Sequence, residues 1–213
     1  MTSDLLSVRV DRPWLTVALP ATWRALSFAP YRPGDVACDR VLWREVRDQD
    51  LTQDFDAVGW LAGEVGSRDA VAMLTSRNVD RFVHRRAVVD GVVAEAVATV
   101  GLSNAERIGT RRDLPDGSYG TINVVVAVSE GLTPTARIEA LSIAASARTA
   151  AVMEAGIPVE AGVATGTGTD CLVVTSPVGK SGFAGMHTGI GEAVGACVFA
   201  AVAQGVSDWL AER

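Results

Sequence analysis

The sequence predicts one α+β domain, in which a mostly antiparallel or mixed sheet is covered by two long alanine-rich helices. Two valine-rich alternating runs joined by Asp90-Gly91 indicate the antiparallel part, and two helical segments rich in small residues follow. With 213 residues, 48% of them hydrophobic, the chain suits one domain with a large core. We therefore treat residues 1–213 as a single domain, in which residues 1–22 form an N-terminal extension of strand and turn.

Short strands separated by turns are expected in the first forty residues. Residues 7–10 alternate, residues 14–19 form a second run that Pro20 should end, and residues 23–29 form a third. Residues 29–35 contain two prolines, which predicts a loop, because proline breaks both ladders and helices. This loop carries a tyrosine and an arginine, so it either lines a pocket or merely connects two strands.

The middle of the chain contains the clearest local signal. Residues 50–62 place apolar side chains at helical spacing, and residues 71–75 read as a short buried strand. Residues 81–89 and 92–100 are alternating runs on either side of Asp90-Gly91. Asp-Gly supplies the positive φ angles of a type I′ turn, so these runs should form a hairpin.

A central strand and a long helix come next. Residues 120–128 are nearly all apolar, which favours a strand inside the sheet. Thr133 and Pro134 are a helix cap and a first-turn proline, and Gly156 with Pro158 should end that helix. Its buried side is expected to follow Ile138, Leu141, Ala145, Arg148, Val152 and Ala155.

The last part of the chain is expected to be a strand, a loop and a helix. Residues 171–175 form the apolar strand, and the helix should run from about His187 to about Trp209. Residues 189–206 are apolar but contain a glutamate, a glutamine and several glycines, which favours a buried helix over a membrane span.

Composition excludes several classes of function. A net charge of -6 argues against a nucleic-acid partner, which usually requires a basic surface. The three cysteines are far apart and form no CxxC pair, so reduced thiols and a cytoplasmic location are expected. No signal peptide is visible at the start of the sequence.

The segment from Thr165 to Gly195 is the first candidate for chemistry. It combines an alternating Gly/Thr turn, a short apolar strand and a helix that opens with a histidine. Glycines let a ligand approach the backbone closely, and threonine hydroxyls add hydrogen-bonding groups. Asp170, His187 and Glu192 could supply acid and base groups, and we expect the turn and the imidazole to line one hollow.

Two weaker candidates and one rejected motif lie elsewhere. Ser103 follows a strand in a Gly-x-Ser pattern, but Ala105 replaces the second glycine of a nucleophile elbow. Ser103 and Asn104 are therefore either a turn or a ligand contact. Asn123 interrupts an apolar strand, so it needs a structural partner or a pocket role. A phosphate loop ending at Lys180 is rejected, because the glycine that it requires six residues earlier is a valine.

Four segments of the chain resemble the conserved blocks of the adenosylcobinamide amidohydrolase family. They are VGLSNA at 100–105, GTIN at 120–123, ATGTGTD at 164–170 and AGMHTGIGEAVG at 184–195. The resemblance covers most of the chain, from about Trp23 onward. It implies a hydrolase that cleaves the amide between the aminopropanol arm and the corrin ring, in corrinoid salvage and remodelling.

From this reaction we assign hypothetical roles, because amide hydrolysis needs a nucleophile, oxyanion donors and an acid for the leaving amine. His187 would be general base and acid, oriented by Asp170 or Glu192. The nucleophile is water or one of three hydroxyls. The expected substrate-binding residues are Ser103, Asn104, Thr121, Asn123, Thr165, Gly166, Thr167, Gly168, Thr169 and Thr188.

No cofactor and no metal are expected. His187, Asp170 and Glu192 are residue types that can bind a metal ion, but their spacing in the sequence matches no known metal-site pattern. The expected partner is a small corrinoid, without nucleic acid or a membrane span, and a homo-oligomer is possible. For the nucleophile, Thr167, Thr169, Ser103 and water remain open. A non-catalytic corrinoid-binding module, or an amidase for another amide-rich metabolite, are the alternative functions.

Overall fold

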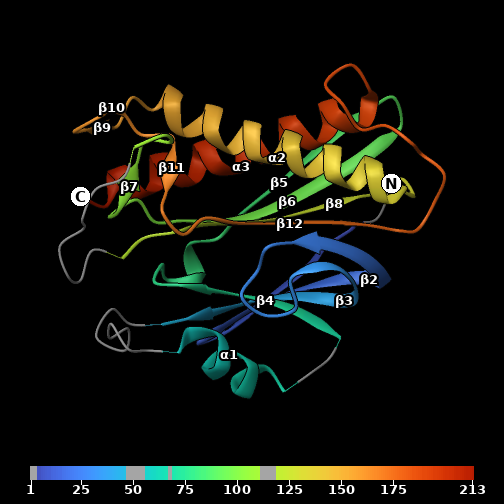
Figure 1. Ribbon diagram of the computed structural model, residues 1–213, viewed down its shortest axis with the longest axis horizontal. Coiled ribbons are helices and arrows are strands. Elements are labelled where there is room, and N and C mark those ends of the chain that lie inside the picture. Colours follow the sequence, from blue (N-terminus) through green and yellow to red (C-terminus); the bar gives the residue numbers. More distant parts are fainter. Residues whose placement is uncertain (1–3, 47–55, 67–68, 111–118) are drawn as a thin grey trace.

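The computed structural model describes residues 4–46, 56–66, 69–110 and 119–213 (Figure 1). Its main sheet has the order β4-β3-β2-β12-β8-β6-β5, and β1 pairs with β2. The strands of this sheet are β1 (Ser7–Asp11), β2 (Trp14–Ser27), β3 (Gly34–Glu45), β4 (Ala70–Thr75), β5 (Val83–Val89), β6 (Val92–Val100), β8 (Ile122–Val128) and β12 (Cys171–Ser176). Short two-stranded ladders join β7 (Ala105–Glu106) to β11 (Gly166–Thr167) and β9 (Pro158–Val159) to β10 (Gly162–Val163).

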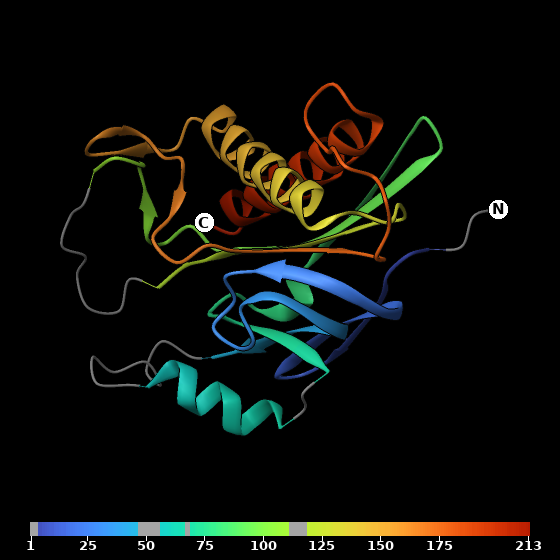
Figure 2. The ribbon, with the colours of Figure 1, turned by 45° about the vertical axis from the view of Figure 1, so that its right-hand side comes forward.

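Four layers are stacked in the molecule. The helices α2 (Pro134–Glu154) and α3 (Gly189–Ala211) cover one face of β5, β6, β8 and β12, as Figures 1 and 2 show. Strands β1 to β4 lie below the other face, and α1 (Ala57–Val65) lies below them. The expected α+β domain with a mixed sheet and two covering helices is confirmed: β3–β4 and β8–β12 pair in parallel, and the other pairs of the main sheet are antiparallel.

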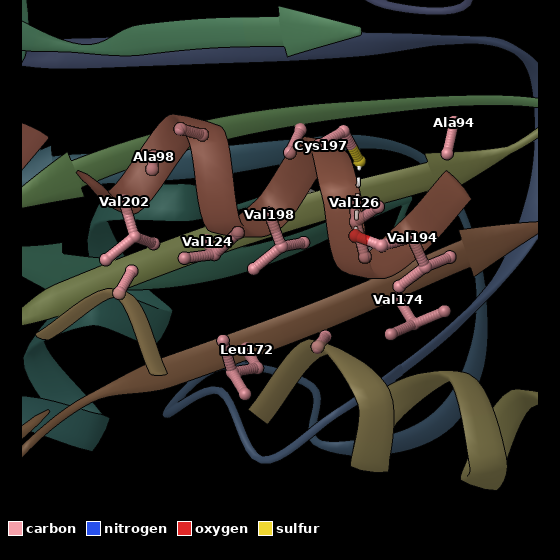
Figure 3. Packing of buried hydrophobic residues seen from close by; sticks show 14 of the residues in the cluster. Ala94, Ala98, Val124, Val126, Leu172, Val174, Val194, Cys197, Val198 and Val202 are labelled. Carbon is pink, nitrogen blue, oxygen red and sulfur yellow. Dashed lines mark hydrogen bonds between the residues drawn. The ribbon is translucent and has the colours of Figure 1, made fainter. Parts of the chain in front are cut away.

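Alternation along the strands builds two cores. Val124 and Val126 of β8 pack toward the helices, whereas Val125 and Ala127 pack toward β1 to β4. Figure 3 shows the helix side, where Val194, Val198 and other small side chains of α3 meet β6, β8 and β12. A strand buried on both faces reads as a continuous apolar run, which is why β8 was predicted to be central.

Small residues allow α3 to pack closely against the sheet. A Cβ built at Gly205 of α3 would lie 2.5 Å from Cγ2 of Val100, so only glycine fits at this crossing. Although α3 is long and apolar enough to cross a membrane by length and composition, one side of it forms the main core. The prediction of a buried helix is confirmed.

The predicted side of α2 is correct only in part, since Val152 is buried and Leu141 and Ala145 pack against the core. Ile138 is 61% exposed, and the buried positions are Ala136, Arg137, Ala140, Ala144, Ala151 and Val152. Alanines rather than larger residues face the core, because α2 packs closely against α3 and β12. Arg137 is buried on this face because its guanidinium donates to the Leu132 carbonyl at 2.8 Å.

Most helices, strands and turns were predicted from local signals in the sequence. The hairpin turn has φ 51° at Asp90 and 83° at Gly91, as a type I′ turn requires. Pro20 does not end its strand: β2 continues to Ser27 through a register shift between Ala18 and Trp23, and a bulge of this kind tolerates proline. Strand β3 was not predicted. Of the helix expected at 50–62, α1 contains the part from Ala57, and residues 50–55 lie outside the described chain.

Candidate active site

Two cavities flank the segment Thr165–Asp170, which we call the bend. The bend cavity has a volume of about 420 Å³, and it is lined by residues 106–110, Arg148, Thr149 and residues 165–168. The strand-end cavity, of about 360 Å³, lies where β4 ends and β8 and β12 begin. It is lined by Pro30, Val46, Ala57, Leu74, Thr75, Ser76, Asn104, Tyr119, Gly120, Thr121, Asn123, Thr169 and Cys171. The bend is therefore a wall shared by both.

Asp170 is the hydrogen-bonding centre of the bend. Its Oδ1 accepts from the Thr167 hydroxyl at 2.5 Å and from the Ile122 backbone N–H at 3.0 Å. Its Oδ2 accepts from the Thr167 backbone N–H at 3.0 Å and forms an ion pair with Arg148 of α2. Because the side chain is only 6% exposed, this carboxylate joins the bend, β8 and α2 inside the fold.

The environment of Asp170 affects its acidity in opposite directions. Burial raises the pKa of its carboxyl above the ordinary value, because desolvation disfavours the charged form. The positive charge of Arg148 and the hydrogen bonds from Thr167 and Ile122 oppose this shift. A buried carboxylate with a raised pKa beside a cavity is typical of a proton-transfer group.

Gly166 is required by this ion pair. A Cβ at position 166 would lie 2.0 Å from Nη1 of Arg148 and 2.5 Å from Oδ2 of Asp170. Any side chain there would displace the guanidinium from the carboxylate. The alternating glycines of the bend were predicted to let a ligand approach, and at Gly166 the group that approaches belongs to the protein itself.

The other threonines of the bend form internal hydrogen bonds. The Thr165 hydroxyl accepts from the Ile108 backbone N–H at 2.8 Å, and the Thr169 hydroxyl donates to the Gly120 carbonyl at 2.9 Å. Of the predicted nucleophiles Thr167 and Thr169, only Thr167 has its hydroxyl on a carboxylate. Gly168 is exposed at the wall of the bend cavity.

The strand-end cavity gathers the predicted residues of the neighbouring strand. The Asn123 amide nitrogen donates to the Leu74 carbonyl at 2.7 Å, which anchors β8 to the end of β4. The Thr121 hydroxyl donates to the Thr169 carbonyl at 2.8 Å and lies 3.1 Å from Oδ1 of Asn123. Burial raises the pKa of the Cys171 thiol to about 12, so this cysteine is a neutral thiol at physiological pH.

Asn104 is the unsatisfied polar side chain of this cavity. It is 4% exposed, and its Oδ1 is buried without a hydrogen-bond partner among the residues that the structure describes. A Cβ at Gly120 would lie 2.7 Å from that oxygen and 2.8 Å from the Ser103 backbone nitrogen, so glycine makes room for the amide. An unpaired buried amide oxygen costs about 1–3 kcal/mol unless a ligand supplies a donor.

The structure does not bring His187 to either cavity. Position 189, two residues along, lies against Asp90 at the hairpin tip, where a Cβ would be 3.2 Å from the carboxylate. Thr121 lies at the other end of β6, since Gly101 donates to its carbonyl. Nine residues of strand at about 3.3 Å each place roughly 25–30 Å between these ends.

The expectation that the imidazole and the bend line one hollow within a single chain is therefore wrong. His187 and Glu192 are exposed, and Thr188 caps α3 by accepting from the Gly191 N–H at 3.0 Å. Asp170 lies at the far end of the sheet, so these three ligand types do not converge in one chain. The prediction failed because closeness in sequence across a strand and a loop does not fix closeness in space.

Ser103 also lies outside both cavities. Its side chain is exposed, and its hydroxyl accepts from Nη2 of Arg213 at 2.9 Å. The structure thus gathers Thr165, Gly166, Thr167, Gly168 and Asp170 on one side, and Asn104, Thr121, Asn123 and Thr169 on the other.

Sequence reasoning missed Arg148 as a site residue. It was assigned only to the apolar side of α2, although a guanidinium on an alanine-rich face needs an anionic partner. Thr75, Ser76 and Tyr119 of the strand-end cavity were missed as well, since no local pattern marks them.

Comparison with known proteins gives one family. The profile of the adenosylcobinamide amidohydrolase family matches residues 2–213. An adenosylcobinamide amidohydrolase from Halobacterium salinarum is 32% identical over 181 residues, which cover 79% of this chain and 74% of that protein. Among solved structures, the PH0078 protein from Pyrococcus horikoshii OT3 is similar with a TM-score of 0.42 and 10% identity, over 91% of this chain and 77% of that one.

Proposed function

The chain belongs to the adenosylcobinamide amidohydrolase family, and on that premise we propose that it hydrolyses the amide between the aminopropanol arm and the corrin ring of adenosylcobinamide. The family is one of amide-bond hydrolases, and the reaction consumes water and releases an amine and a carboxylic acid. The family name supports the choice of substrate in this proposal. The placement of the chemistry rests on the geometry of the bend.

One observation carries that placement: the Thr167 hydroxyl donates to a buried carboxylate that an arginine holds in place. A nucleophile bonded to a base, with the base oriented by a third group, is the arrangement that recurs in enzymes with activated hydroxyls. Here the three groups are Thr167, Asp170 and Arg148. Thr167 and Arg148 line the bend cavity, where a scissile amide would reach them.

In this mechanism Thr167 Oγ1 attacks the amide carbon, and Asp170 accepts the hydroxyl proton. Arg148, whose guanidinium borders the same cavity, stabilises the charge that develops on the amide oxygen. The C–N bond then breaks, and the proton passes from Asp170 to the leaving nitrogen. Water, activated by the same carboxylate, hydrolyses the resulting ester and frees the corrinoid acid.

His187 as general acid and base, the role predicted from the sequence, is the alternative assignment. Within one chain the ring lies at the opposite end of the sheet, so this role requires a second copy of the chain. The homo-oligomer that the sequence left open would then be essential for activity. The Thr167–Asp170 pair needs no second copy, and we favour it for that reason.

The test is incubation with adenosylcobinamide followed by mass analysis of the corrinoid and of the intact protein. We expect loss of aminopropanol, and a transient acyl adduct that Thr167→Val abolishes and Thr167→Ser retains. Turnover should fall at least about a hundredfold in Thr167→Val. Unaltered turnover in that variant would make water the nucleophile. Binding without release of amine would favour a corrinoid-binding module, and a panel of corrinoids left intact would favour another amide substrate.

A further inference from the structure

One apolar side chain stands at the rim of the bend cavity. Ile108 is 82% exposed, the largest exposed fraction among the large hydrophobic residues of the described chain. It lines the cavity together with Gly109, Thr110 and Gly168, which are also exposed. Single exposed apolar side chains are common on protein surfaces, so exposure by itself implies no function. Ile108 stands apart because the same cavity is lined by Thr167, the proposed nucleophile.

Hydrogen bonds tie this part of the rim to the bend. The Ile108 backbone N–H donates to the Thr165 hydroxyl at 2.8 Å. Thr110 closes the next turn, since its N–H and its hydroxyl donate to the Arg107 carbonyl at 3.2 and 2.7 Å. The φ angle of 85° at Gly109 is the value that the third residue of a type II turn requires. Ile108 is therefore carried on a turn that is fixed relative to the bend.

The volume of the bend cavity limits what can enter it. About 420 Å³ lies near the lower end of the range for ligand pockets, roughly 300–1,000 Å³. A corrin macrocycle needs far more room, so only the arm that carries the scissile amide can enter. The ring has to stay outside, against the rim. A Cβ at Gly168 would meet no atom of the described chain within 4 Å, so the rim is open at that position.

We propose that Ile108 is a substrate-contacting residue, on which the apolar periphery of the corrin ring rests while the cleaved arm enters the bend cavity. The inference rests on the proposed function for the identity of the substrate. The corrin periphery carries methyl groups, and covering an exposed isoleucine with them removes apolar surface of both partners from water. The ring takes no part in amide cleavage, so the contact is equally strong in the ground state and in the transition state. It contributes to affinity and not to the rate constant of the chemical step.

The experiment compares the steady-state kinetics of wild-type protein, Ile108→Ser and Ile108→Leu with adenosylcobinamide. For Ile108→Ser we expect KM to rise about tenfold with kcat nearly unchanged, because uniform binding is lost. Ile108→Leu keeps the apolar area and should resemble the wild type. The corrinoid acid retains the ring but lacks the aminopropanol arm, and it should bind to Ile108→Ser about tenfold more weakly as well.

Ile138→Ser is the matched control. Ile138 is also an exposed isoleucine, at 61%, and it lies on α2 ten residues before Arg148, about 15 Å away along the helix. Its replacement should leave KM and kcat unchanged. Both isoleucines are exposed, so neither serine variant should impair folding, which thermal unfolding checks. An unchanged KM in Ile108→Ser, a loss confined to kcat, or an equal loss in Ile138→Ser would overturn the inference and leave the proposed function intact.

Failure of the proposed function gives a different result. Wild-type protein would then leave adenosylcobinamide intact, and equilibrium dialysis of the intact corrinoid gives its dissociation constant. A dissociation constant about tenfold higher in Ile108→Ser, and unchanged in Ile138→Ser, would still support the contact. The same dissociation constant in all the proteins would overturn it.

Discussion

The bend and the start of α3 were the two segments that the sequence marked most strongly for chemistry, and they lie in opposite environments. Asp170 at the bend is 6% exposed and accepts four hydrogen bonds from Thr167, Ile122 and Arg148. His187 and Glu192 at the start of α3 are exposed, and the local bonds there belong to a helix cap.

The difference shows how structure separates two kinds of polar motif. Buried polar groups are positioned and desolvated, which is what shifts acidity and holds a reactive geometry. Polar groups at a helix start satisfy free backbone donors, and this role alone explains the half-buried Thr188. On this basis the bend is the better candidate for the reacting groups.

The largest expected effect is that of Asp170→Asn. An amide cannot accept the proton of the attacking hydroxyl, so turnover should fall at least about a hundredfold. The new NH₂ group would also face N–H donors on either side, which should cost about 1–3 kcal/mol of unfolding free energy. Steady-state assays and denaturant unfolding measure the two effects, with Asp208→Asn on the outer side of α3 as the control. Near-normal turnover would remove Asp170 from the mechanism.

Arg148→Met should change the pH dependence of kcat/KM. The base works ionised, so activity falls as pH drops through the pKa of Asp170, and burial places that limb above the ordinary aspartate value of 3.8. Arg148 lowers this pKa, so removing its charge should move the acidic limb to higher pH. A pH–rate profile measures the shift. An unmoved limb would show that another group controls it.

His187→Ala should have the smallest effect. An exposed side chain away from the reacting atoms changes free energies by about 0.5 kcal/mol or less, which corresponds to about twofold in turnover. Assays across a range of protein concentrations, with light scattering for the mass of the particle, provide the check. A hundredfold loss would reverse the comparison, and would mean that the ring acts at the cavity of a second copy.

Much of the fold could be predicted from the sequence, because its signals are local. Asp90-Gly91 fixed the hairpin, Thr133 the start of α2 and Thr188 the start of α3, each through residues at most a few positions apart. Strand β3 was not predicted, and the prediction that Pro20 ends its strand was wrong. In both places pairing with distant strands overrides local preference.

The candidate site was predicted only in part. Residues 165–168 of the bend line one cavity, in keeping with their contiguous glycines and threonines, whereas Thr169 lines the other. Which side chain each of them contacts was not predictable. Asn123 bonds to a carbonyl 49 positions away, and Asp170 pairs with an arginine 22 positions away on a helix.

By itself, the amino-acid sequence determined the α+β class, the caps, the hairpin and the resemblance to an amidohydrolase family. Tertiary structure alone decided that Asp170 meets Thr167 and Arg148, that Asn104 is left unpaired, and that His187 lies at the other end of the sheet. The physical reason is that β12 inserts between β2 and β8, far from either in the chain. Such a sheet order arises from burying both faces of the central strands β6, β8 and β12, and the pattern of neighbouring residues does not contain it.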